Sequence, residues 1–149
     1  MRSISIDASE GRAEGTAVVK ADHPMLADHF PGTPVLPGSL LIELAAQVAG
    51  PLAEETVRQQ EGIERWAMLG MIRDAKFLHP TRLPATVLIT AGTLRSEPSR
   101  VITRVTARVC EQEVLRAELW MMMLEASSEW AEAITQRALR VARWKGRAS

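Results

Sequence analysis

A proline-rich stretch followed at once by an apolar stretch places the strongest limit on how this chain folds. Residues 22–38 hold four prolines and two glycines: Pro24, Pro31, Pro34, Pro37, Gly32 and Gly38. Proline fixes φ and lacks a backbone N–H, so this segment is neither regular helix nor central strand. We expect an ordered, irregular loop, and stiff loops of this kind often position functional side chains.

The residues after this loop predict a buried helix. Ser39 is a residue type that caps helices, and of the ten residues that follow it only Glu43 and Gln47 are polar. A helix that is apolar almost all round belongs in a core. The Gly50-Pro51 pair is a stop signal, so we expect the helix to end there, with a second, polar helical stretch over 52–60.

The chain after this region has the texture of β-strands and then of a helix. Strands are predicted at 16–20, 66–71, 76–79, 86–93, 100–110 and 114–124. The clearest is 100–110, where small apolar residues and threonine alternate with a face that carries three arginines. A helix is predicted at 128–145, with the apolar set Trp130, Ile134, Leu139 and Val141. One buried helix and five or six mostly antiparallel strands indicate an α+β fold.

Length and composition indicate one ordinary domain of 149 residues. The apolar fraction is 46% and the charged fraction 24%, as in folded globular proteins. We expect residues 1–15 to be a flexible or edge segment and 126–149 to form a C-terminal helix. Eighteen basic side chains balance eighteen acidic ones, and neither nucleic-acid binding nor a membrane span is predicted. The single Cys110 suits a reducing cytoplasm.

Three features of the loop and helix converge on one kind of chemistry. An imidazole in a rigid turn, as at His29, can act as a base near neutral pH. The backbone N–H of Gly38 opens a helix and can hold a developing oxyanion. Glu43 has apolar neighbours, so we expect burial to raise its pKa and make it a proton donor. Gln47 lies one turn further on and can orient Glu43 or a water.

A base, an oxyanion donor and a protonated acid are what elimination next to a carbonyl requires. The base takes the Cα proton, the amide holds the enolate oxygen, and the acid protonates the departing β-hydroxyl. The residues alone leave a second interpretation open, in which His29 is a structural turn residue and Glu43 pairs with an arginine.

The same segment resembles the signature of the hot-dog-fold 3-hydroxyacyl-(acyl carrier protein) dehydratases. Their pattern is H-F-P-G-x-P-x-x-P-G, then four residues and an acid, often followed by A-Q. The matching residues are His29, Phe30, Pro31, Gly32, Pro34, Pro37, Gly38, Glu43, Ala46 and Gln47. Residues 76–80, K-F-L-H-P, resemble the K/R-F-x-x-P strand of that family, and the resemblance covers about residues 16–124. Asp28 and Leu44 depart from it, where glycine and a small residue are usual.

The resemblance implies a curved antiparallel sheet wrapped around a long central helix, and a homodimer or higher even oligomer. By resemblance, His29 removes the Cα proton, Glu43 of the partner protomer handles the β-hydroxyl, and Gly38 binds the thioester carbonyl. Phe30, Pro37 and Gln47 are expected to contact substrate. The substrate is a 3-hydroxyacyl chain on the phosphopantetheine arm of acyl carrier protein, and neither a metal nor a redox cofactor is involved.

The resemblance thus predicts a cytoplasmic dehydratase, a lyase of fatty acid, polyene or polyketide assembly. Two rival functions remain open. In a hot-dog thioesterase, the same acid and amide would activate water against the thioester carbonyl; His29 in its H-F-P-G setting favours the dehydratase. In a non-catalytic acyl-carrier-binding subunit, the fold would persist without the chemistry; the presence of both His29 and Glu43 favours an enzyme. His23, which precedes a proline, is expected to be a turn residue.

Overall fold

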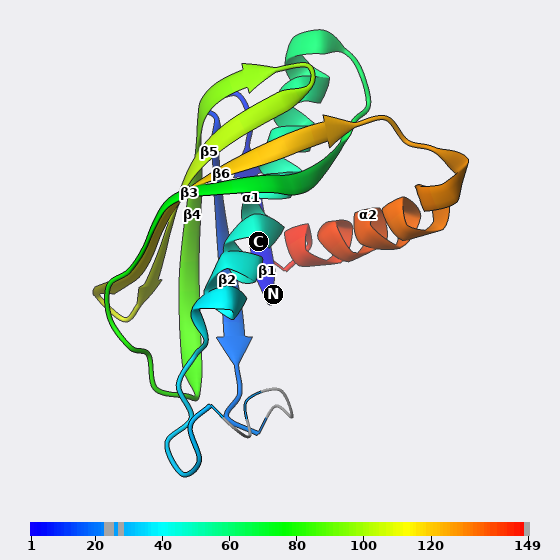
Figure 1. The fold of residues 1–149 in the computed structure, drawn as a ribbon. Helices are drawn as coiled ribbons and strands as arrows, with labels where there is room; N and C mark the ends of the chain where they lie inside the picture. The colour runs from blue at the N-terminus through cyan, green and yellow to red at the C-terminus, as the bar shows by residue number, and fades with distance from the viewer. Residues whose placement is uncertain (23–25, 27–28, 148–149) are drawn as a thin grey trace.

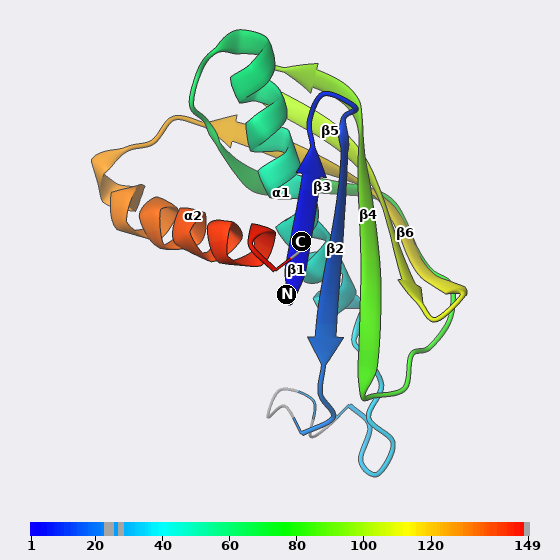
Figure 2. The same ribbon diagram turned by 180° about the vertical axis from the view of Figure 1, so that it is seen from behind.

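Six antiparallel strands form one curved sheet around a long helix (Figures 1 and 2). The structure is a computed structural model and describes residues 1–22, 26 and 29–147; His23 and Asp28 lie outside the described residues. The elements are β1 (Ser3–Asp7), β2 (Arg12–Val19), α1 (Gly38–Glu61), β3 (Trp66–Phe77), β4 (Ala85–Glu97), β5 (Arg100–Val109), β6 (Gln112–Leu124), η2 (Ser128–Trp130) and α2 (Ala131–Lys145). The predicted fold class is confirmed.

The strand order is β1-β2-β4-β5-β6-β3, so β1 and β3 form the two edges of the sheet. In β5 the predicted alternation is confirmed: Val101, Thr103 and Val105 are buried against α1, while Arg104 is exposed on the outer face. This period of two gives the sheet one apolar, concave face, and α1 fills it. The segment 1–15 forms β1, at one edge of the sheet, and the start of β2.

Helix α1 is longer than the sequence predicts. The Gly50-Pro51 pair predicts an end, but the helix continues to Glu61, so this prediction is wrong. A proline inside a helix costs about 3 kcal/mol, because it removes one backbone hydrogen bond and crowds the preceding turn. Leu52 and Val57 are fully buried on the turns that follow. Each such burial stabilises the fold by about 1.5–3 kcal/mol, which outweighs the cost of the proline.

Both ends of α1 are closed by backbone groups. Pro37 is the N-cap residue, and its carbonyl accepts hydrogen bonds from the amides of Leu40 and Leu41, both at 3.1 Å. Ser39 lies inside the first turn, and the predicted cap there is wrong. At the other end Gly62 adopts a left-handed conformation, with φ of 68°, and donates its N–H to the Arg58 carbonyl at 3.0 Å.

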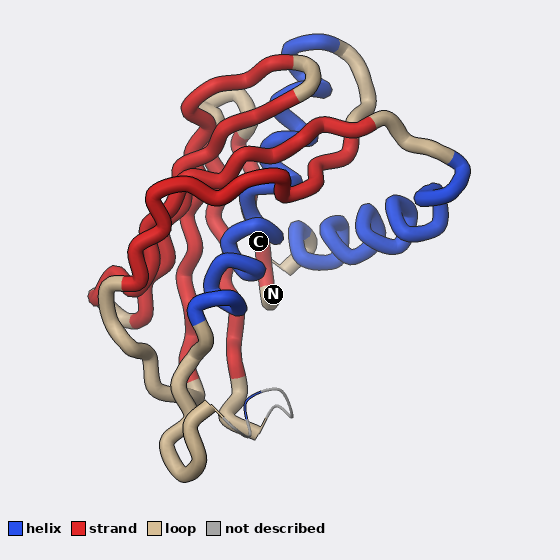
Figure 3. Tube along the Cα trace, viewed as in Figure 1, coloured by secondary structure: helices blue, strands red, loops and turns tan. Residues whose placement is uncertain are grey.

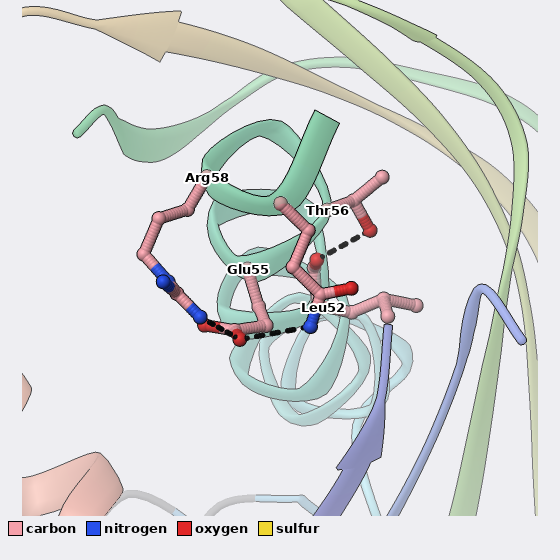
Figure 4. A network of polar contacts seen from close by, with 5 residues as sticks. Leu52, Glu55, Thr56 and Arg58 are labelled. Atoms are coloured by element: carbon pink, nitrogen blue, oxygen red, sulfur yellow. Dashed lines mark hydrogen bonds and ion pairs between the residues drawn. The ribbon is translucent and has the colours of Figure 1, made fainter. Parts of the chain in front are cut away.

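The last turns of α1 carry a small polar network (Figure 4). Arg58 and Gln59 both donate to the carboxylate of Glu55. The hydrogen bond from Arg58 holds the pKa of Glu55 below its ordinary value. The buried hydroxyl of Thr56 donates to the Leu52 carbonyl at 2.8 Å, so this polar group is satisfied inside the core.

Strand β3 is continuous where two strands are predicted. Register shifts between Leu69 and Met71, and between Arg73 and Lys76, let one strand pass through the irregular stretch without losing its pairing to β6. From residue 70 to its end at Phe77 every residue of β3 is exposed. The far side of β3 is the second edge of the sheet.

Helix α2 lies beyond α1, on the side away from β4 and β5 (Figures 1 and 2). None of its residues is fully buried. Trp144 packs against the core, whereas Leu139, which the sequence places in the apolar set, is 59% exposed. This part of the predicted apolar face is wrong, because Ile134, Val141 and Trp144 follow the helical period and Leu139 lies off it. No helix among the described residues is both long enough and apolar enough to cross a membrane.

Candidate active site

His29 lies in the loop between β2 and α1, and the loop is pinned around it. Its amide donates to the Leu26 carbonyl at 3.0 Å, and its carbonyl accepts from the amide of Val35 at 2.9 Å. The tight turn between them is closed by the amide of Thr33, which donates to the Phe30 carbonyl at 3.0 Å. Residues 29–37 of the loop therefore have an irregular conformation that is held by backbone hydrogen bonds.

The imidazole of His29 is half-buried and stacks on the ring of Phe30, with centroids 4.9 Å apart. Phe30 itself is 59% exposed. A large aromatic ring left in solvent beside a histidine is available to a ligand or to another protein surface. The predicted substrate contact of Phe30 stays a prediction.

A second segment, residues 80–84, fixes the loop from the side (Figure 3). The amide of Leu36 donates to the Thr81 carbonyl at 2.8 Å, and the amide of Leu83 donates to the Pro34 carbonyl at 3.0 Å. Leu36 and Thr81 are both buried. These bonds tie the loop that carries His29 to the connection between β3 and β4, a few residues before the loop enters α1.

The amino end of α1 is packed tightly against β3. A Cβ atom added to Gly38 would lie 2.8 Å from Cε1 of the Phe77 ring, so only glycine allows this approach. The sequence predicts that Gly38 lets a ligand approach the backbone closely. Within one chain, the ring of Phe77 occupies the space that a side chain at position 38 would need. Pro37 is half-buried at the rim of a neighbouring cavity.

Glu43 and Gln47 are brought together on α1 as predicted. The Nε2 of Gln47 donates to Oε1 of Glu43 at 3.0 Å, one helical turn away. Glu43 is exposed, however, although its apolar neighbours Leu41 and Leu44 are buried. The predicted burial of Glu43 is wrong for a single chain, because this side chain points off the face that packs on the sheet.

Two cavities border Glu43. One, of about 750 Å³, lies beside the end of β2 and is also lined by Leu26, Pro37 and Leu40. The other, of about 270 Å³, lies between α1, β3 and α2 and includes Gln47. His29 lines neither of them. One chain therefore presents the histidine and the acid on the same loop–helix unit without placing them in a common cavity.

Helix α2 also reaches this region, which the sequence does not predict. Arg137, Arg140, Val141 and Trp144 of α2 line the smaller cavity together with Glu43. The helical spacing of Val141 and Trp144 was the available signal. Among the described residues, no three His, Cys, Asp or Glu side chains are grouped so that they could hold a metal ion.

The sequence was compared with those of known protein families, and one family matches most of the chain. Residues 2–118 match the model of the FabA-like domain. The chain belongs to the FabA-like family. Over 76 residues it is 38% identical to the 3-hydroxyacyl-(acyl-carrier-protein) dehydratases FabZ of Klebsiella pneumoniae and Salmonella arizonae. That match covers 50% of this chain, and the chain spans about half the length of these relatives.

Solved structures show the same hot-dog fold at low sequence identity. The dehydratase heterocomplex ApeI:P from Xenorhabdus doucetiae is similar with a TM-score of 0.64 at 14% identity, over 89% of this chain and 86% of that one. A thioesterase from Haemophilus influenzae has a TM-score of 0.59 at 19% identity, over 82% and 78%. A Streptococcus mutans protein bound to acetyl-CoA has a TM-score of 0.60 at 18% identity, over 80% and 86%. Together, the family match and these neighbours show that the chain has the hot-dog fold.

Proposed function

We propose that the protein dehydrates 3-hydroxyacyl thioesters, carried on acyl carrier protein, to trans-2-enoyl thioesters. The observation that carries this proposal is that His29 lies in a hydrogen-bonded loop that leads directly into α1, the helix of Gly38 and Glu43. The FabA-like match and the FabZ relatives, which are named as dehydratases of such thioesters, support it.

Each of the three groups has one role in the elimination. Neutral His29 removes the proton from Cα, and the electron pair of that C–H bond becomes the new double bond. The Gly38 amide donates to the thioester oxygen, where negative charge develops. Glu43, in its protonated form, gives a proton to the β-hydroxyl, so the C–O bond breaks and water leaves. Exchange with solvent then returns the proton from His29 to Glu43, and the cycle needs no cofactor.

We assign the complete site to two protomers. The proposal that another chain supplies the histidine is supported by one observation: within one chain His29 lines neither cavity of Glu43. The exposed edge of β3 offers a surface for two-fold pairing, because an unpaired strand edge is ready to bind another chain. In such a dimer the partner also covers Glu43, which is exposed in one chain alone.

A thioesterase is the second candidate, because a thioesterase is among the structural neighbours. In that reaction Glu43 would take a proton from water, the hydroxide would attack the thioester carbonyl, and the thiolate would leave. His29 has no role in this scheme, yet its backbone is fixed by hydrogen bonds to Leu26 and Val35. We therefore favour dehydration.

One assay separates these functions. The purified protein is mixed with a 3-hydroxyacyl thioester of acyl carrier protein, while the absorbance of the conjugated enoyl thioester and the release of free thiol are followed together. Dehydration gives the enoyl signal without thiol. Thiol without the enoyl signal would establish the thioesterase instead. Carrier binding with neither product would leave only a non-catalytic acyl-carrier-binding subunit.

A further inference from the structure

The cavity between Glu43 and α2 is partly built by a segment outside the FabA-like match. The match ends at residue 118, whereas α2 covers residues 131–145. Four of the twelve residues that line the cavity belong to α2. The α2 wall of this cavity therefore lies outside the residues that match the family.

Polar contacts hold α2 in this position. Glu54 of α1 accepts a hydrogen bond from the amide of Ala67, at the start of β3, and forms an ion pair with Arg137 of α2. The guanidinium of Arg137 crosses α1 at Gly50, where an added Cβ would lie 2.8 Å from Nη2. Glu54 thus joins three elements, and the small residue at position 50 leaves room for the arginine.

The shape and lining of the cavity suit the hydrocarbon chain of a ligand whose polar end lies at Glu43. Glu43, Gln47 and Pro51 line it along one side of α1, over a length of about 12 Å, since a helix rises 1.5 Å per residue. Eight of its twelve lining residues are apolar, and the largest of them is Trp144. Arg137, bound to Glu54, lies near Gly50 and so at the end away from Glu43.

We propose that α2 is the wall of the acyl-binding cavity, and that Trp144 and Val141 set the length of acyl chain that the protein accepts. This inference rests on the proposed function, in which Glu43 acts at the reacting end of an acyl thioester. The carbons beyond that end enter the space between α1, β3 and α2. Trp144 limits that space because its ring is packed against the core and not free in solvent.

Binding of inert ligands tests this without catalysis. The probes are acyl-pantetheine analogues of increasing chain length, with an amide in place of the thioester and no 3-hydroxyl, so that they are neither hydrolysed nor dehydrated. For the wild-type chain, calorimetry should give affinities that rise with chain length and then stop rising. Trp144→Ala should move that limit to longer chains and tighten binding of the longest probe about tenfold, the low end of what one methylene contributes in a pocket.

Leu139→Ala is the matched control, because Leu139 lies on the same helix and is exposed. It should keep the wild-type limit. Val141→Ala is the second variant, should Trp144→Ala lower the melting temperature. An unchanged limit in both cavity variants, or no gain in wild-type affinity with chain length, would overturn the inference. Failure of the dehydration assay, with the shift in chain length still observed, would overturn the proposed function and leave the acyl-binding wall standing.

Discussion

Backbone hydrogen bonds hold His29 in place, so its side chain can be replaced without removing the contacts that fix the loop. Both its amide and its carbonyl are hydrogen-bonded, and the imidazole stacks on Phe30. We expect His29→Ala to lower the dehydration rate by about 10² to 10⁴, the usual contribution of a general base, with little change in melting temperature. His79→Ala, at an exposed histidine in another loop, is the control. A rate within about threefold of wild type would remove His29 from the mechanism.

Glu43 can be tested with an isosteric change. A glutamine at this position keeps an oxygen that accepts from Gln47, and the site is exposed in one chain. Glu43→Gln should therefore abolish dehydration, since an amide cannot donate the required proton, while thermal unfolding stays within a few degrees of wild type. Glu61→Gln, at an exposed position on the same helix, serves as the control. If activity survived in Glu43→Gln, another group would have to be the acid.

At the scale of single elements, the apolar exposure of β3 predicts where a second chain binds. Ile72 lies opposite the buried Leu119, so it shares the concave face of the sheet, yet it is 43% exposed. We expect the wild-type chain to sediment as the proposed dimer, and Ile72→Lys to sediment as a monomer and to lose activity. Leu88→Lys, on β4 and also 43% exposed, should stay dimeric. A dimeric, active Ile72→Lys protein would rule out this edge as the interface.

The elements also show which sequence signals were reliable. The alternation in β5 predicts its two faces correctly, because a period of two is a local property of the strand. The end of α1 is mispredicted because Pro51 is a local signal for a stop, and the burial of Leu52 and Val57 that overrides it involves distant strands. Leu139 was misassigned for a related reason. Helix α2 packs through one narrow face, and from the sequence alone more than one set of its apolar residues could have formed that face.

At the scale of the whole molecule, local contacts in the candidate site could be predicted but not the cavity around them. The helix pattern predicts that Gln47 lies beside Glu43, and their hydrogen bond confirms this. The roles of His29, Gly38 and Glu43 stay predictions. The burial of Glu43 depends on what covers it, and one chain leaves it exposed. The contribution of Trp144 depends on how α2 returns across α1, which no local pattern encodes.

The shared site leads to a test that uses the symmetry of the assembly. A two-fold dimer has two equivalent sites, each taking His29 from one chain and Glu43 from the other. In a mixed dimer of His29→Ala and Glu43→Ala chains, one site carries both lesions and the other carries none. Random exchange makes about half of the dimers mixed, so about a quarter of wild-type activity should return when the two variants are refolded together. Each variant alone is the control. Mixed dimers that are demonstrably present but inactive would place both residues of the pair in one chain, because only a site within one chain is damaged in both halves of such a dimer.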